Sequence, residues 1–206
     1  LQFQLGSRAV QSYFGDGCYM SGYDHALPTK WAYSDVADGG IWEDGDVRKE
    51  ESIRYDFTYY GQTPDLNNIL WEDLGSDHDE LDPHIKKYED FRTDTHSGLG
   101  LNNEWYSGKN IPFLRLGNAI LLYAECLNEL GETPEAVRQV NRVRERAWDF
   151  YIPEEMKWNE GMSQSQFREE IMTERVRELF GERWRKFDLI RTGHFLEYVS
   201  ERNKWT

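Results

Sequence analysis

The chain has few of the residues that usually mark a metal or nucleophilic centre. Two of its 206 residues are cysteine and five are histidine. The histidines are scattered and lack the HExxH or paired spacing of zinc sites. The sequence contains no GxSxG motif, and its glycine-rich stretches lack the GxxxxGK[ST] and GxGxxG contexts of nucleotide-binding loops. We therefore predict no catalytic residue, no metal ligand and no cofactor.

Long apolar runs are also absent. No stretch approaches the roughly 18 consecutive apolar residues of a membrane-spanning helix. The chain opens at Leu1-Gln2-Phe3, without a methionine, a signal peptide or a lipid-acceptor cysteine. Of the two cysteines, Cys126 is expected to be a buried small apolar residue of a helix, and a disulfide with Cys18 is not favoured.

Basic residues are outnumbered: 24 Lys and Arg stand against 38 Asp and Glu, a net charge of −14. Residues 35–94 hold 18 acids and 6 bases, a net of −12, so the acidity belongs to one segment. It argues against a nucleic acid, an anionic membrane surface or a polyanionic ligand as partner. The clusters Asp35–Asp46 and Asp77–Asp82 offer oxygens to Ca²⁺ but lack EF-hand spacing, so we favour a solvated acidic surface.

The composition changes near residue 110, which divides the chain into residues 1–110 and 111–206. The first part is rich in Gly, Asp and aromatic residues, which indicates an irregular, loop-rich lobe. Alternating β-formers predict a strand within Asp46–Tyr60, and Ile85–Tyr88 predicts a second short strand. With Gly61–Pro83 as a loop, the two strands would form a small hairpin joined by a long excursion.

Residues 111–206 have helical periodicity. A first helix is expected from Pro112 in its first turn to Leu130, with Gly131 ending it. A second helix, capped by Thr133, is expected to run to Ala147. The short turn between them predicts an antiparallel hairpin that resembles a tetratricopeptide unit. A lone unit cannot bury its faces, so we expect further repeats or packing against the C-terminal block.

The C-terminal block, Glu174–Gly193, mixes charged and apolar residues on the same helical side. Ser163–Gln166 forms a capping box for the helix that leads into it, and a last short helix is expected at His194–Arg202. Arg175 and Glu178 fall among apolar residues, where unpaired charges are costly. Because they are three residues apart, we expect them to pair. We also expect cross-helix ion pairs, with donors Arg142, Arg144 and Arg146 and acceptors Glu174, Glu178 or Asp188.

Two motifs resemble the SusD/RagB family. One is the closing motif, with Glu174-Arg175, Glu178-Leu179-Phe180-Gly181-Glu182-Arg183, Phe187-Asp188-Leu189-Ile190-Arg191 and Gly193. The other comprises Phe113-Leu114-Arg115-Leu116, Leu122-Tyr123-Ala124-Glu125, Leu127-Asn128-Glu129 and Val140–Ala147. Their order and spacing agree with the family, and one departure is Gly117-Asn118, where Ala-Glu is common.

The resemblance implies a fold and a role. The expected fold is mostly α, a SusD-like fold with a tetratricopeptide-like hairpin packed against a loop-rich lobe containing a few short β-strands. Family members are surface lipoproteins of Bacteroidetes that capture nutrients, mostly glycans. The chain would be the C-terminal part of such a protein, at the extracellular face of the outer membrane, with membrane contact only through a lipid anchor outside this fragment. Its expected partners are an oligosaccharide or polysaccharide and a TonB-dependent SusC-like transporter.

Aromatic residues in polar, Gly/Asp-rich surroundings suit glycan binding. Sugar rings stack on Trp and Tyr through their C–H faces, while their hydroxyls need polar partners. Seven such rings lie between residues 23 and 71, and our glycan-stacking candidates are Trp31, Tyr33, Trp42 and Trp71. The alternative is that these rings form the core of a lobe that lacks aliphatic residues.

Other functions stay open. A helical-repeat protein-interaction module would use its aromatic rings only structurally, and a capture protein could carry peptides instead of glycans. A glycoside hydrolase needs two carboxyl groups about 5–10 Å apart. Glu178 and Glu182 lie one helical turn apart, but Arg175, Arg183 and Arg185 are adjacent, which favours structural ion pairs. We expect a binding protein and not an enzyme.

Overall fold

The computed structural model describes residues 12–14, 18–20, 27–54, 56–58, 67–70, 83–87 and 110–201. The chain divides into two compact units. Unit 1 comprises Leu1–Pro28 and Glu50–Ile111, and unit 2 comprises Thr29–Lys49 and Pro112–Thr206. One boundary between the units lies between Ile111 and Pro112, and residues 29–49 belong with the helices.

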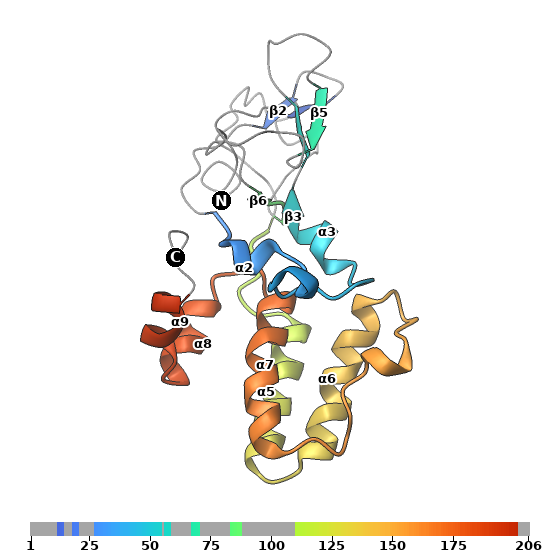
Figure 1. Ribbon diagram of the computed structural model, residues 1–206, viewed down its shortest axis with the longest axis vertical. Helices are drawn as coiled ribbons and strands as arrows, with labels where there is room; N and C mark the ends of the chain where they lie inside the picture. The colour runs from blue at the N-terminus through green and yellow to red at the C-terminus, as the bar shows by residue number, and fades with distance from the viewer. Residues whose placement is uncertain are drawn as a thin grey trace. The chain divides into compact units, whose positions relative to one another are not determined.

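Unit 2 is built on three helices: α5 (Leu116–Glu129), α6 (Thr133–Ala147) and α7 (Gln164–Glu178). They run alongside one another (Figure 1). Gly131, at a φ of 84°, makes the tight turn between α5 and α6 in a backbone conformation that favours glycine. The expected helical hairpin is confirmed, and α7, which leads into the C-terminal block, packs against it.

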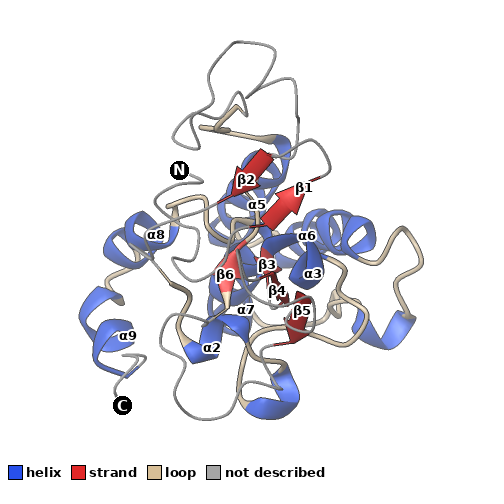
Figure 2. Cartoon of the chain, turned by 90° about the horizontal axis from the view of Figure 1, so that it is seen from above, coloured by secondary structure: helices blue, strands red, loops and turns tan. Residues whose placement is uncertain are grey.

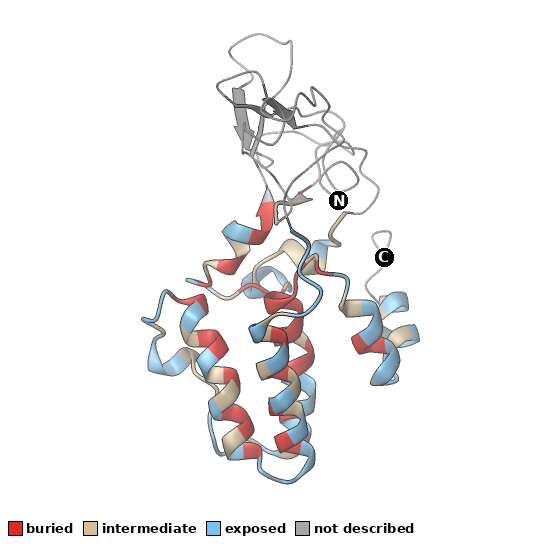
Figure 3. Ribbon diagram, turned by 180° about the vertical axis from the view of Figure 1, so that it is seen from behind, coloured by how far each residue is buried: buried red, intermediate tan, exposed pale blue. Residues whose placement is uncertain are grey.

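The core of unit 2 lies between these helices. Figure 3 shows buried positions recurring along all three; in α5 and α6 they are mostly apolar, whereas in α7 they include charged residues. The apolar cluster at the centre of the core consists of Leu121, Ala124 and Leu127 of α5, Ala136, Val137, Val140 and Val143 of α6, and Phe167 and Ile171 of α7. Packing against the C-terminal part thus covers one face of the hairpin.

Helix α5 begins later than its apolar spacing predicts. Arg115 is extended, with φ −133° and ψ 165°, so the first helical residue is Leu116 and Phe113 stays exposed. The side chain of Arg115 reaches the end of α7, where Nε donates to Glu182 at 2.9 Å. Because Arg115 is extended and bonded to Glu182, the extra helical turn expected from Pro112 does not form.

The face of α5 opposite the core carries an exposed stripe. Its members are Leu116, Ala119, Tyr123, Cys126 and Leu130, which recur at spacings of three and four residues and therefore share one side of the helix. Cys126 is a free cysteine, so it forms no disulfide. The expectation that it is buried was wrong because its helical phase places it outside.

Shorter helices complete unit 2 (Figure 2): α2 (Lys30–Tyr33), η1 (Val36–Asp38), η5 (Glu154–Met156), α8 (Arg185–Arg191) and α9 (Phe195–Glu201). Helix α9 confirms the expected last helix. Ser163 caps α7, since its Oγ accepts a hydrogen bond from the Gln166 amide at 3.2 Å.

The named strands all belong to unit 1 and form antiparallel pairs. These are β1 (Ser12–Phe14) with β2 (Cys18–Met20), β3 (Ile53–Arg54) with β6 (His84–Ile85), and β4 (Asp56–Thr58) with β5 (Asn67–Leu70). The pairing of Ile53 with Ile85 confirms the expected hairpin.

Two details of the hairpin prediction were wrong. The supposed loop contains β5, and the start of the supposed first strand is helix α3 (Arg48–Ser52). Asp46 explains the helix, because its Oδ1 accepts a hydrogen bond from the Arg48 amide at 3.0 Å. Among the described residues, no helix has both the length and the apolar character needed to cross a bilayer.

Candidate functional site

Residues 29–49, the aromatic segment, carry three of the four predicted glycan-stacking residues. The segment contains α2 and η1 and folds back on itself. The Val36 amide donates to the Trp42 carbonyl at 2.8 Å, and Asp35 and Trp42 form an isolated bridge. A Cβ added at Gly40 would overlap the backbone of Ser34, so this turn requires glycine.

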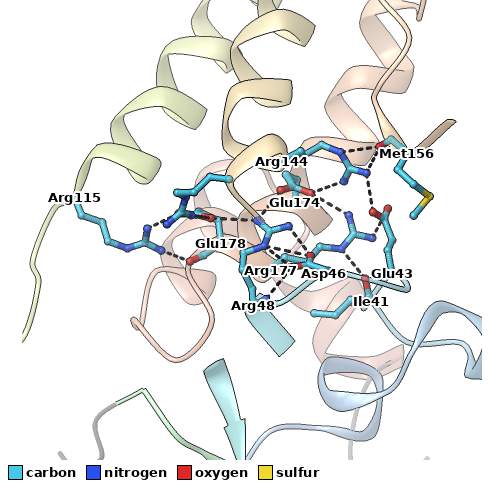
Figure 4. Close-up of polar contacts among 11 residues, drawn as sticks. Ile41, Glu43, Asp46, Arg48, Arg115, Arg144, Met156, Glu174, Arg177 and Glu178 are labelled. Atoms are coloured by element: carbon cyan, nitrogen blue, oxygen red, sulfur yellow. Dashed lines mark hydrogen bonds and ion pairs between the residues drawn. The ribbon is translucent and has the colours of Figure 1, made fainter. Parts of the chain in front are cut away.

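Two buried carboxylates of α7 hold the aromatic segment (Figure 4). Glu174 accepts from Arg48 Nη1 at 2.8 Å, and from Arg144 Nη1 and Arg177 Nη1 at 3.0 Å each. Glu178, one turn further along, pairs with Arg48 at 3.1 Å, with Arg146 at 2.5 Å and with Arg115. Both glutamates are 1% exposed or less.

The aromatic segment contributes the matching charges. Arg48 binds Asp46 through Nη2 at 2.7 Å and through Nε at 2.9 Å. Glu43 accepts from Arg144 Nη2 at 2.7 Å and pairs with Arg177 Nη2 at 3.1 Å. We call this network the ionic latch; it consists of Glu43, Asp46, Arg48, Arg144, Glu174, Arg177 and Glu178. It fixes the segment to α6 and α7.

Two members of the ionic latch, Glu174 and Arg48, are held in their charged forms. Burial by itself would raise the pKa of Glu174, but the attraction of Arg48, Arg177 and Arg144 outweighs burial and holds that pKa well below its usual range. Burial opposes the charge of Arg48 in the same way, and Glu174 and Asp46 more than restore it, so the Arg48 pKa lies above its usual value. A carboxylate fixed in one charge state is suited to structure and poorly suited to proton transfer.

The expected ion pairs are confirmed in part. Arg144 pairs with Glu174, and Arg146 pairs with Glu178. The expected pair between Arg175 and Glu178 was wrong. Arg175 turns to α8 instead, where Nε donates to Asp188 Oδ2 at 2.9 Å, while Glu178 pairs with Arg48, Arg115 and Arg146.

The acidic cluster Asp35–Asp46 is largely paired. Asp35 binds Lys49 Nζ at 2.7 Å, and Glu43 and Asp46 belong to the ionic latch. A solvated surface was therefore the wrong expectation for Glu43 and Asp46, whereas the Asp35 side chain stays 49% exposed. Within the described ranges, no group of three or more His, Cys, Asp or Glu residues is placed to hold a metal ion. Asp77–Asp82 lies outside them.

Trp42 is a core residue. Its side chain is 0% exposed, its Nε1 donates to the Ala32 carbonyl at 2.8 Å, and its ring packs against Phe180 at a centroid distance of 5.7 Å. A sugar needs an open ring face, so the structure argues against Trp42 as a stacking residue. The local sequence could not reveal this, since the partners that fix the segment around Trp42 come from α6 and α7.

Trp31 and Tyr33 of α2 are partly exposed and stay candidates, while Trp71 lies outside the described residues. The Arg185 guanidinium lies 5.6 Å from the centroid of the Trp31 ring and 4.9 Å from that of Tyr198. Arg185 also donates to the Met172 carbonyl at 3.0 Å. Arg185 thus connects Trp31 to α7 through Met172 and to α9 through Tyr198.

The loop between α6 and α7 forms a cavity that sequence reasoning missed. Its volume is about 670 Å³, and Trp158 and Asn141 are among the residues that line it. The sequence signal for this cavity is an aromatic residue, Trp158, flanked by Lys157, Asn159 and Glu160 in one short loop.

Comparisons with known proteins agree on a family. The SusD family model matches residues 4–205. SusD-like protein P2 of Formosa agariphila is 31% identical over 175 residues, which cover 84% of this chain and 32% of that protein. SusD-like protein P25 of the same organism is 43% identical over 96 residues, which cover 47% of this chain and 18% of that protein.

Solved structures show the same fold. A SusD homolog from Bacteroides thetaiotaomicron aligns over 76% of this chain and 32% of its own, with a TM-score of 0.56 and 25% identity. A SusD superfamily protein from Bacteroides vulgatus aligns over 98% of this chain and 38% of its own, with a TM-score of 0.59 and 18% identity. This chain therefore spans less than two fifths of each of these relatives. The family match over nearly its whole length, together with the mostly helical fold, shows that the chain belongs to the SusD family.

Proposed function

We propose that the chain is part of a surface protein that captures oligosaccharide at the outer face of the outer membrane. The protein delivers it to a TonB-dependent SusC-like transporter, and a lipid anchor outside these residues attaches it to the membrane. The observation that carries this proposal is the SusD family match over residues 4–205.

The geometry of unit 2 supports capture by stacking. Trp31 and Tyr33 are partly exposed on a segment that the ionic latch fixes to the helices. Rigid presentation lowers the entropy lost when a ligand binds. Sugar faces stack on the rings, and neighbouring polar groups bind the hydroxyls.

The carboxylates support binding in preference to hydrolysis. Glu178 and Glu182, the carboxylate pair that the sequence suggests for a glycosidase, both bind Arg115. Glu178 also binds Arg48 and Arg146, so its oxygens are occupied by cations. A hydrolase needs two carboxyl groups that can reach the glycosidic bond, whereas both of these are bonded to arginine.

A binding screen of the full-length protein against a glycan panel tests the proposal. We expect one glycan class to bind without breakdown, and the Trp31→Ala and Tyr33→Ala variants to bind it roughly tenfold more weakly. Tyr151→Ala is the matched control, because Tyr151 is 88% exposed and lies outside the aromatic segment. Unchanged affinity in both variants would reject this site, and product release would revive the hydrolase.

The exposed stripe on α5 favours a second candidate, a helical-repeat module that binds another protein. Leu116 is 73% exposed, Tyr123 55% and Leu130 77%, so the stripe offers an apolar helix face. This candidate predicts no glycan effect of the Trp31 variant. Peptide binding without glycan binding would identify peptides as the cargo.

A further inference from the structure

The cavity between α6 and the following loop has the dimensions of a ligand site. Its volume of about 670 Å³ falls within the roughly 300–1,000 Å³ of small-molecule pockets. Asn141, Arg142 and Glu145 of α6 line one side, and Glu155, Trp158 and Asn159 line the other. None of the four aromatic candidates belongs to it.

The wall around Trp158 is preformed. The amide of Trp158 donates to Asn141 Oδ1 at 2.9 Å, and Asn141 Nδ2 donates to the Trp158 carbonyl at 3.0 Å. The Trp158 ring meets Phe167 edge to face at a centroid distance of 5.6 Å, and the Arg144 guanidinium lies 5.9 Å from its centroid. These contacts fix the loop to α6 and α7, so a ligand would not have to order it.

The lining keeps polar groups available to a ligand. The side-chain oxygens of Glu145 and Glu155 accept no hydrogen bond and join no ion pair in the part of the chain that the structure describes. Arg142 donates Nη1 to Gln139 at 2.5 Å, which leaves further guanidinium donors. The cavity thus combines an aromatic residue with open acceptors and donors.

The charges of the residues that line the cavity favour some classes of ligand over others. Four carboxylates and three cations line the cavity, a net charge of −1, so a polyanion gains nothing there. A neutral saccharide matches the lining, because its hydroxyls both donate and accept and its C–H groups suit the part of the Trp158 ring that the core leaves exposed. We propose that this cavity is a second saccharide-binding site, separate from Trp31 and Tyr33 and selective for neutral sugars. The proposal rests on the proposed function only for the class of ligand.

Fluorine NMR of the full-length protein labelled with 5-fluorotryptophan tests this site directly. The Trp158 signal is assigned with Trp158→Phe and the Trp31 signal with Trp31→Phe. The probes are neutral hexasaccharides of glucose, xylose and mannose, with hexagalacturonate as the charged comparator. We expect one neutral probe to shift the Trp158 signal saturably, also in Trp31→Ala. The double variant Arg142→Gln/Glu155→Gln should weaken that binding roughly tenfold. The control Glu170→Gln, exposed on α7, should not.

Each outcome separates the two proposals. A shift of the Trp31 signal alone overturns the cavity site and leaves the proposed function standing. A shift of the Trp158 signal alone supports the cavity and rejects stacking on Trp31. Equal affinity of the double variant and the unmodified protein overturns the cavity site, and tighter binding of hexagalacturonate overturns its selectivity. If no signal moves at about 10 mM of any probe, both proposals fail.

Discussion

Gly117 and Glu178 approach so closely that a methyl group added to Gly117 would overlap the Glu178 carboxylate. This contact accounts for glycine at a position where the family pattern commonly has alanine. We expect Gly117→Ala to lower the free energy of unfolding by about 1–3 kcal/mol, because Glu178 is held by three arginines and cannot move freely. Urea unfolding followed by circular dichroism measures it. A gain of about 0.5–1 kcal/mol, as in an open helix, would contradict the close approach.

The ionic latch makes a strong stability prediction. Glu174→Gln leaves Arg48, Arg144 and Arg177 with less compensating charge in a buried site, so we expect a loss of about 3–5 kcal/mol. Glu170→Gln is the control on the same helix. It is exposed, so its effect should stay within about 0.5 kcal/mol. Similar unfolding curves for the two variants would mean that the latch contributes little.

Acid should weaken the latch. The pKa of Glu174 is lowered in the folded protein from an ordinary value of 4.5, because its arginine partners outweigh burial. Below about pH 5 the unfolded chain therefore binds a proton that the folded chain does not, and stability falls as pH falls. We expect the free energy of unfolding between pH 7 and pH 3 to decline less steeply in Glu174→Gln. Parallel declines would show that other groups dominate acid unfolding.

Two tryptophans of the aromatic segment should respond in opposite ways. Trp42→Ala empties a fully buried site and should cost about 3–5 kcal/mol of stability. Trp31→Ala removes a partly exposed ring and its contact with Arg185, at a cost of about 1 kcal/mol or less. Thermal unfolding of both variants checks this order. The reverse order would mean that Trp31 is the structural ring.

The helical hairpin could be predicted from the sequence because its information is local. Apolar residues recur at helical spacing, and Gly131 and Pro134 mark where one helix ends and the next begins. The start of α5 was misplaced for the opposite reason. Arg115 is extended toward Glu178, 63 residues away, and helical spacing carries no record of that contact.

The ionic latch shows where reading the sequence fails for the site. Arg48 and Glu174 are separated by 126 residues, and nothing in the local pattern of either predicts the pair. Without that pair, the acidic stretch around Asp46 suggests a solvated loop, and Trp42 resembles an open ring. The sequence gives the number of charges in this segment, but the arginines and glutamates of α6 and α7 decide which of them are buried.

The aromatic segment has two parts, one that attaches it to the helices and one that carries the partly exposed aromatic rings. Ile41, Glu43, Asp46 and Arg48 hold the segment, whereas Trp31 and Tyr33 lie outside the network. Substitutions within residues 30–33 therefore leave the ion pairs of the latch in place, and Trp31→Ala removes the contact with Arg185. A segment grafted from a relative should seat on this scaffold if it keeps the three charged residues. The latch would thus hold different ligand-binding loops on the same helices.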